Sequence, residues 1–354
     1  MLGTTSQKTH YNPAILVAAL LSTLFLLPGV GAQAQPFGTW GIFSPGPDGY
    51  VEIPHSPALN PASEITLEAW VNLAADSTCR SIAGKNFNLA WWIGSCNNVL
   101  RSYLKGNASE QTAGTIPPNR WTHVAVTFDG TTRRHYINGE LAGSWVEPGP
   151  LTASPSPVRI GSDVSWNFIP DGTLDEVRLW NVARTVEEIR TTINVQQTSP
   201  RPGLVAVWGL EGPVDNVGSF DGVFVGDVFG LTFPVAPSCG VSGGPFLCLA
   251  DRFQVRIGWR APDDSTGDGT AAPCGTDDSG LFWFFNPDNW EILVKALDGC
   301  SINNRWWIFS AATTNVFYRM EVLDVVAGVQ KIYFNYPGPP APAVTDTSAF
   351  ATCP

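Results

Sequence analysis

Few side chains in this sequence have the types and the spacing that catalysis needs. A serine-type triad requires a histidine base that a carboxylate orients, and beyond residue 34 the only histidines are His55, His123 and His135. His123 lies inside a predicted strand and His135 lies beside a predicted hairpin. We therefore interpret the histidines as structural or surface residues, and we assign no catalytic residue.

Aromatic side chains are stronger candidates for ligand binding. The apolar face of a sugar ring stacks on Trp or Tyr, and the candidates here are Trp91, Trp92, Trp145 and Trp166. Adjacent strand residues point to opposite faces, so we expect Trp91 or Trp92 to lie on a surface. The alternative is that these side chains fill the core between two sheets.

Three carboxylates in predicted turns or strand ends are candidate calcium ligands, namely Asp48, Asp171 and Asp175. Calcium is a hard cation that binds oxygen ligands from loops, and it is the one cofactor that the sequence suggests. Asp48 and Asp171 each precede a glycine, so ordinary turns explain them without a metal. The cysteines include no Cys-x-x-Cys pair, which argues against zinc.

The elements that must position these residues are strands. In residues 65–73 and 121–128 apolar and polar residues alternate with the two-residue period of a half-buried strand. Asp129-Gly130 and Asn138-Gly139 supply the positive φ angles of tight hairpins. Further strands are predicted at 50–53, 80–83, 89–94, 99–104, 133–137, 141–145, 158–160, 173–180 and 204–210. Thr185 and Glu188 form a capping box that predicts one short helix.

A second set of strands is predicted after residue 239, at 252–260, 281–285, 290–297, 305–309, 317–325 and 330–334. With 35 Gly and 29 Pro in 354 residues, many turns and few helices are expected. We predict an all-β protein with two domains, at 35–231 and 239–354, joined by a linker at 232–238.

The first 34 residues have the pattern of a secretory signal. Lys8 precedes a short apolar run at 14–27, and Ala32-Gln33-Ala34 is a small-x-small cleavage site. No later run is long enough for a transmembrane helix, so we expect a secreted, extracellular protein cleaved after Ala34. Its formal net charge of −11 argues against nucleic acid as a partner.

Five motifs occur in order along the first domain: YVEIPHSPALNP (50–61), ITLEAWVNL (65–73), RWTHVAVTFDG (120–130), YINGELAG (136–143) and GTLDEVRLWNVARTVEEI (172–189). Together they resemble the laminin-G-like jelly roll of the concanavalin A-like lectin/glucanase superfamily. The resemblance implies two stacked antiparallel sheets that bind glycans or extracellular proteins, and in many members a calcium ion.

The same superfamily includes glycoside hydrolases that place two acids across a groove. Glu68 and Glu176 are the pair that this comparison suggests, because each is predicted on the face that carries Trp70 or Trp180. Both also fit ordinary hydrogen bonding on a sheet face that is open to solvent, and the closely spaced Glu residues of the hydrolase motifs are absent.

The second domain resembles a recurring C-terminal β module of secreted bacterial proteins of unassigned activity. The matching segments are CLADRFQVRIGWR (248–260), DSGLFWFFNPDNWEILVKALDGC (278–300), RWWIF (305–309) and DTSAFATC (346–353). We predict a smaller, disulfide-stapled β-sandwich.

Seven cysteines in an exported chain predict disulfides and one leftover thiol. Cys79 and Cys96 flank a predicted hairpin, which makes their pairing easy, and Cys239 and Cys248 could close a Gly-rich loop. The resemblance to the C-terminal module implies a Cys300–Cys353 pair, with Cys274 left free. A meander of strands would instead bring Cys274 and Cys300 to the same end, so both pairings stay open.

Together these observations favour a secreted, non-catalytic protein that recognises a glycan or an extracellular protein through a lectin-like sandwich. The alternatives are a glycan-processing hydrolase or lyase on the same fold, and a structural protein of the cell surface. The oligomeric state cannot be predicted from these patterns.

Overall fold

A computed structural model of the chain describes residues 40–43, 49–165, 170–210, 212–226, 228–231, 239, 242, 244–338 and 341–354. In this part of the chain the helices are η1 (Pro57–Leu59), α1 (Val186–Thr192) and α2 (Cys300–Asn303), and all other regular elements are strands. The predicted all-β fold class is therefore confirmed. The predicted signal sequence and the linker at 232–238 lie outside the described residues.

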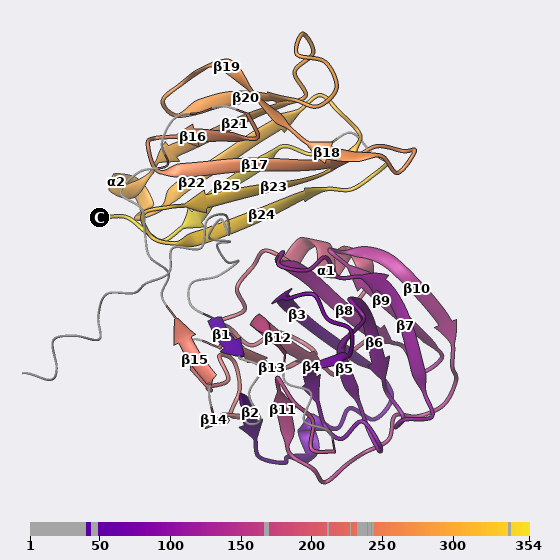
Figure 1. Ribbon diagram of the computed structural model, residues 1–354. Helices are drawn as coiled ribbons and strands as arrows, with labels where there is room; N and C mark the ends of the chain where they lie inside the picture. The colour runs from indigo at the N-terminus through magenta and orange to yellow at the C-terminus, as the bar shows by residue number, and fades with distance from the viewer. Residues whose placement is uncertain are drawn as a thin grey trace, which may run out of the picture. The chain divides into compact units, whose positions relative to one another are not determined.

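Two antiparallel sheets form what we call the first sandwich (Figure 1). The β8 sheet contains, in spatial order, β10 (Glu140–Val146), β9 (Thr132–Ile137), β8 (Thr122–Phe128), β3 (Ile65–Leu73), β12 (Gly172–Trp180), β1 (Trp40–Phe43) and β15 (Val228–Leu231), with β13 (Leu204–Trp208) beside β12. The β5 sheet contains β14 (Val223–Gly226), β2 (Gly49–Ile53), β11 (Val158–Ile160), β4 (Cys79–Gly84), β5 (Trp92–Cys96), β6 (Val99–Tyr103) and β7 (Glu110–Thr115).

The core of the first sandwich lies between these two sheets. The alternating residues of β3 that were predicted to share one face all lie in it: Ile65, Leu67, Ala69, Val71 and Leu73. The opposite face of β3 was expected to be open to solvent, and that expectation is wrong. Thr66, Glu68 and Trp70 are buried as well, because further segments cover this face of the β8 sheet.

The two hairpins predicted around β9 have the expected backbone geometry. Gly130 has φ +86°, and Asn138 and Gly139 have φ +51° and +74°. Two successive positive φ angles match the right-handed twist of the flanking strands. Asp129 fixes the first turn, since its Oδ1 accepts hydrogen bonds from the backbone N–H groups of Thr131 and Thr132 at 3.0 and 2.7 Å.

Helix α1 begins with the predicted capping box. The Thr185 hydroxyl accepts from the Glu188 N–H at 3.2 Å, and the Glu188 carboxylate accepts from the Thr185 N–H at 2.7 Å. Ile189 of this helix packs with Ala125 and Tyr136 on the outer face of the β8 sheet. The helix therefore covers part of the face opposite the core.

Two further antiparallel sheets form the second sandwich, coloured orange to yellow in Figure 1. The β17 sheet contains β16 (Phe246–Leu249), β17 (Phe253–Arg260), β23 (Phe317–Asp324) and β24 (Val329–Asn335), with β18 (Thr266–Asp268) beside β17. The β21 sheet contains β19 (Thr270–Thr276), β20 (Ser279–Trp283), β21 (Ile292–Asp298), β22 (Trp306–Ala312) and β25 (Val344–Phe350). Their core includes Phe253, Phe282, Ile308 and Phe350.

Three disulfides brace the two sandwiches. The structure joins Cys79 to Cys96, Cys239 to Cys248 and Cys300 to Cys353, and it leaves Cys274 as an exposed thiol. The first two pairs are those predicted from the sequence, the third is the pair that the resemblance implied, and the structure does not contain the rival Cys274–Cys300 bond. Among the described residues, no helix has the length and apolar character needed to cross a membrane.

Candidate functional site: the outer face of the β5 sheet

The outer face of the β8 sheet is closed by the chain segment that includes and follows α1. The Trp70 indole N–H donates to the Ile193 carbonyl at 3.0 Å. The Arg178 guanidinium donates to the carbonyls of Thr192 at 3.2 Å and Val195 at 2.9 Å. Trp70 and Arg178 are at most 1% exposed, so a ligand cannot reach this region of the sheet.

Residues of the second sandwich contact the same face. The Trp70 and Phe334 rings are stacked with centroids 6.5 Å apart, and Ile332 joins the apolar cluster of Trp70 and Trp121. The Arg319 guanidinium donates to the Trp121 carbonyl at 2.5 Å. These contacts cover this part of the β8 sheet further, so it does not offer an open binding surface.

The two carboxylates considered for hydrolysis belong to a buried ionic cluster. Glu68 contacts Arg184 at 2.5 Å, His123 at 3.3 Å and Arg178 at 3.7 Å. Glu176 contacts Arg178 at 2.8 Å. Arg178 therefore brings the two acids together, as the hydrolase hypothesis requires, but both carboxylates are only 1% exposed. They do not flank a groove.

The ionisation of these acids reflects this packing. Burial would raise the pKa of Glu68, but the hydrogen bond with His123 and the positive charges of Arg184 and Arg178 lower it to about 2. Burial raises the pKa of Glu176, and the neighbouring Arg178 opposes that increase. Glu68 therefore stays ionised at neutral pH and holds two arginines in place, which is a structural role.

A bulge in β12 helps to position Glu176. The register between β12 and β3 shifts between Asp175 and Arg178, and Glu176 has φ +48°. Such a bulge re-aims side chains by placing extra residues opposite one partner. A simple two-residue period across 173–180, as assumed from the sequence, does not reveal it.

A serine and a histidine that are far apart in sequence meet between the two sheets. The Ser102 hydroxyl lies 2.7 Å from His135 Nε2, and the Arg133 guanidinium donates to that hydroxyl at 3.2 Å. All three side chains are fully buried. Burial lowers the pKa of His135 to about 3, so the imidazole is neutral. This contact was not predicted from the sequence, and it lies out of reach of a substrate.

The structure does not bring the predicted tryptophans together. Trp91 lies in the core, and its indole N–H donates to the Leu59 carbonyl at 3.2 Å. Trp92 lies on the outer face of the β5 sheet, but it is only 3% exposed. The prediction that one of the two has an open surface is therefore wrong. Trp145 is partly exposed on the edge strand β10, 4.8 Å from the His135 ring, and Trp166 lies outside the described residues.

Trp92 is buried because other side chains lie over it. Its indole N–H donates to the Ser81 hydroxyl at 2.9 Å, and its ring lies so close to Gly94 that any Cβ there would collide with it. Tyr103 of β6 packs on it with ring centroids 5.6 Å apart, and Phe87 packs on Tyr103 at the same distance. The sequence rule about opposite faces was correct, but it does not predict such covering.

Tyr50 of β2 and Tyr103 of β6 are both partly exposed aromatics on this face, and Tyr103 is held by polar neighbours. Its hydroxyl donates to Glu110 Oε2 at 2.8 Å, and Arg101 contacts Glu110 Oε1 at 3.3 Å. Burial, together with the bond to Glu110, raises the pKa of the Tyr103 hydroxyl. We call Arg101, Tyr103, Glu110 and Thr112 the tyrosine face, with Trp92 beneath it. Strand pairing places Tyr103 opposite Glu110, and Arg101 opposite Thr112.

Buried polar contacts order the loop after β4, which lies beside the tyrosine face. The buried Asp163 accepts hydrogen bonds from the backbone N–H groups of Asn86 and Phe87 at 2.9 and 3.1 Å. The Lys85 ammonium donates to the Ser156 carbonyl at 2.7 Å, and burial lowers its pKa to about 8. The hydrogen bond to Asp163 therefore fixes Phe87, which in turn contacts Tyr103.

The predicted calcium ligands do not form one site in the described residues. Asp171 lies exposed in a turn, and Asp175 is buried four residues later. The rise along a strand separates their Cα atoms by about 13 Å, which is too far for a shared ion. No group of three His, Cys, Asp or Glu residues in the described part of the chain could hold a metal. Asp48 lies outside the described residues, so calcium binding stays a prediction.

The positions of Asp171 and Asp175 predict how a calcium-dependent change in Tm would respond to substitution. We expect the difference in Tm between excess calcium and EDTA to be the same in the wild type and in Asp175→Asn, because Asp175 is buried away from Asp171. A ligand that binds only the folded state raises its stability, so thermal unfolding measures the response. Loss of a calcium shift in Asp175→Asn would contradict this placement. If calcium does not change the Tm of the wild type, the prediction that the protein binds calcium is wrong.

Comparison with known proteins identifies the fold of the first sandwich. Residues 45–190 match the family model described as the concanavalin A-like lectin/glucanases superfamily. This segment has the concanavalin A-like fold. The match spans β2 to α1, and so includes the tyrosine face. The predicted jelly-roll sandwich is thereby confirmed for this part of the chain.

The individual proteins that resemble this chain share only a small part of its sequence or a low sequence identity with it. The chain is 37% identical over 78 residues to Pappalysin-1 of Mus musculus, and the match covers 20% of this chain and 5% of that protein. A putative carbohydrate-binding protein from Bacteroides ovatus is 20% identical, with a TM-score of 0.46, over 56% of this chain and 61% of that chain. A heptameric SAP-like pentraxin from Limulus polyphemus is 16% identical, with a TM-score of 0.43, over 56% and 96% of the two chains.

Proposed function

We propose that the protein is exported and binds a glycan, without transforming it, through the tyrosine face of its concanavalin A-like sandwich. The observation that carries this proposal is the contrast between the two outer faces of that sandwich. The β8 sheet is closed over Glu68, Trp70 and Arg178, whereas the β5 sheet presents a partly exposed, fixed tyrosine.

The tyrosine face has the chemistry that a sugar requires. The ring of Tyr103 offers an aromatic surface for the apolar C–H groups of a pyranose. Arg101 supplies hydrogen-bond donors, Glu110 supplies acceptors and the hydroxyl of Thr112 supplies both. The Arg101–Glu110 ion pair and the Tyr103–Glu110 hydrogen bond hold these groups in place before a ligand arrives. Such pre-organisation reduces the entropy lost on binding.

Non-catalytic binding is supported by the surroundings of the candidate acids. Glu68 and Glu176 are the pair that could have supplied the acid and base of a glycosidase, and both are enclosed with Arg178. A glycosidase needs a carboxylic acid that can protonate the leaving group at working pH. The low pKa of Glu68 and the burial of both groups oppose that role.

We expect Tyr103→Ala to weaken the affinity for a bound glycan by about tenfold, because an aromatic stacking contact contributes up to about 1.4 kcal/mol. Tyr103→Phe keeps the ring and loses only the bond to Glu110, so its loss should be smaller. Titration calorimetry with a glycan selected on an array measures both changes.

Trp145→Ala is the matched control, because Trp145 is also a partly exposed aromatic of this sandwich but lies on edge strand β10. Its affinity should equal that of the wild type. A loss of binding in Trp145→Ala with full binding in Tyr103→Ala would move the site to the β10 edge and contradict the proposal.

A further inference from the structure

The outer face of the β21 sheet in the second sandwich is rich in aromatic and apolar side chains. In β20, β21 and β22 alternate residues such as Phe282, Val294 and Ile308 are buried in the core. The intervening residues point to the opposite side and are at least partly exposed. We call them the aromatic face: Ser279, Leu281, Trp283, Leu293, Lys295, Leu297, Trp307, Phe309 and Ala311.

Strand register sets the order of these residues across the face. Leu297 lies opposite Trp307, and Lys295 lies opposite Phe309. The rings of Trp307 and Phe309 are 6.3 Å apart with their planes at 79°. The two rings therefore line a corner beside Lys295, where one ring can present its face and the other its edge to the same ligand.

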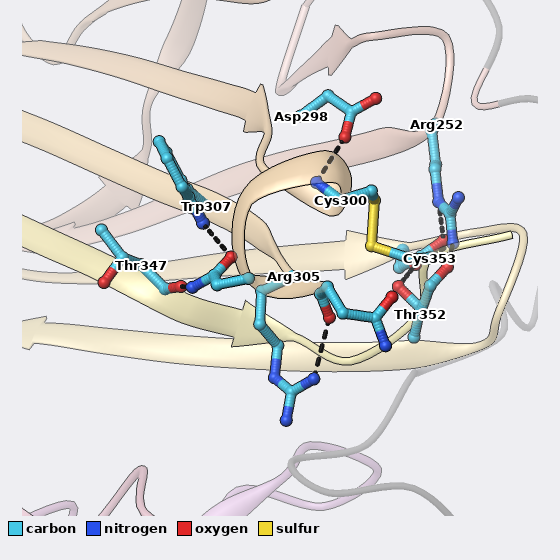
Figure 2. The surroundings of a disulfide bond; sticks show 11 residues. Arg252, Asp298, Cys300, Arg305, Trp307, Thr347, Thr352 and Cys353 are labelled. Carbon is cyan, nitrogen blue, oxygen red and sulfur yellow. Dashed lines mark hydrogen bonds and ion pairs between the residues drawn. A yellow bond between two sulfur atoms is a disulfide. The ribbon is translucent and has the colours of Figure 1, made fainter.

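Trp307 is held rigidly in this position (Figure 2). Its indole N–H donates to Asn303 Oδ1 at 2.8 Å, and Asn303 Nδ2 donates to the Thr347 carbonyl at 2.8 Å. The ring also lies directly on Gly299, where any Cβ would be 2.2 Å from indole atoms. The orientation of the ring is thus fixed by α2, by β25 and by a glycine.

A disulfide anchors the helix that holds Trp307 (Figure 2). Cys300 begins α2 and is bonded to Cys353 near the C-terminus, and the Cys300 N–H donates to Asp298 Oδ1 at 2.8 Å. The chain beside Cys353 is held in turn, since the Arg252 guanidinium donates to the Thr352 carbonyl at 2.6 Å. These cross-links order a partly exposed tryptophan whose ring is not part of the core.

We propose that the aromatic face is a second binding site, for a neutral pyranose glycan. The apolar faces of sugar rings stack on Trp and Phe, and the ammonium of Lys295 donates hydrogen bonds to sugar hydroxyls at the same place. The chain has a formal net charge of −11, which disfavours anionic glycans and nucleic acids as ligands. A neutral glycan fits the aromatic corner, the single cation and the overall charge.

A second copy of the chain is the main rival occupant, and Lys295 argues against it. Lys295 lies in β21, the central strand of this sheet, with Ser279 and Phe309 opposite on either side. Face-to-face packing about a two-fold axis would bury one such lysine from each copy. Bringing two like charges together in a buried interface is costly, whereas a sugar leaves the ammonium hydrogen-bonded.

The test is titration of the full secreted chain with cellohexaose, chitohexaose, xylohexaose and mannohexaose. We expect at least one of them to bind, and Trp307→Ala to weaken that binding by about tenfold. Trp307→Phe keeps an aromatic ring and should lose less. If Trp307→Ala fails to fold, Phe309→Ala replaces it, because Phe309 is a partly exposed member of the same corner and we expect a similar loss.

Tyr103→Ala separates this site from the one in the first sandwich. Binding at the aromatic face should be unchanged in Tyr103→Ala, and binding at the tyrosine face should be unchanged in Trp307→Ala. The proposal is overturned if none of these oligosaccharides binds, if Trp307→Ala and Phe309→Ala bind as the wild type does, or if gel filtration shows a wild-type dimer that Trp307→Ala dissociates.

Discussion

Arg178→Ala is expected to lower the free energy of unfolding by about 3–5 kcal/mol, because it leaves buried carboxylates without their shared partner. The Arg178 side chain is fully buried, lies 2.8 Å from Glu176 and 3.7 Å from Glu68, and also donates to two carbonyls of the segment around α1. Its loss would therefore affect both the charge balance and the covering of the β8 sheet. Urea denaturation of the folded chain measures the effect.

Arg201→Ala is the control for this experiment. Arg201 is also an arginine of the first sandwich, but it is exposed in the turn before β13, and surface substitutions usually change stability by about 0.5 kcal/mol or less. A loss below about 1 kcal/mol in Arg178→Ala would contradict the account of the ionic cluster as the element that closes this sheet. It would also mean that Glu68 and Glu176 could have a role other than stabilising the fold.

His135 is expected to make the protein less stable as the pH falls below 6.5. Burial depresses its pKa from 6.5 to about 3, so the unfolded chain binds a proton that the folded chain excludes. This contribution is fully present above pH 6.5 and is lost as the pH falls toward 3. Between pH 6.5 and 4.5 the loss from this one group should be about 2 kcal/mol.

The measurement compares the free energy of unfolding at these two pH values in the wild type and in His135→Gln. Glutamine does not titrate, so the variant should lose about 2 kcal/mol less than the wild type over this interval. The contribution of Glu68, whose pKa is lowered from 4.5 to about 2, is lost only below this interval.

Ser102→Ala separates titration from the loss of a hydrogen bond. It removes the hydroxyl that lies 2.7 Å from His135 Nε2 but keeps the imidazole, so it should lower stability and retain the pH dependence. Equal pH dependence in the wild type and His135→Gln would show that this histidine does not remain neutral in the folded protein.

Local patterns were sufficient to predict much of the fold. The alternation in β3, the positive φ angles at Gly130 and Gly139, and the capping box at Thr185 depend on neighbouring residues, and all are present. β7 was missed because its sequence EQTAGT is polar and small throughout and it lies at the edge of the β5 sheet. A strand with little apolar alternation gives no periodic signal.

The candidate site was harder to predict because burial depends on distant segments. Trp92 was expected as a binding residue, yet Phe87 and Tyr103 cover it. Glu68 was expected on a solvent face, yet the segment around α1 returns over it. Tyr103 itself could have been found, since Leu100 and Leu104 alternate with it and are buried in the core. That spacing places its ring on the outer face of β6.

The most direct test of glycan binding by the tyrosine face is a broad glycan array probed side by side with the mature wild-type chain and Tyr103→Ala. We expect the wild type to bind a defined subset of glycans and Tyr103→Ala to lose most of this signal, apart from neutral glycans that depend on Trp307. An array without wild-type binding, or with the same pattern for both proteins, would contradict glycan binding by the tyrosine face.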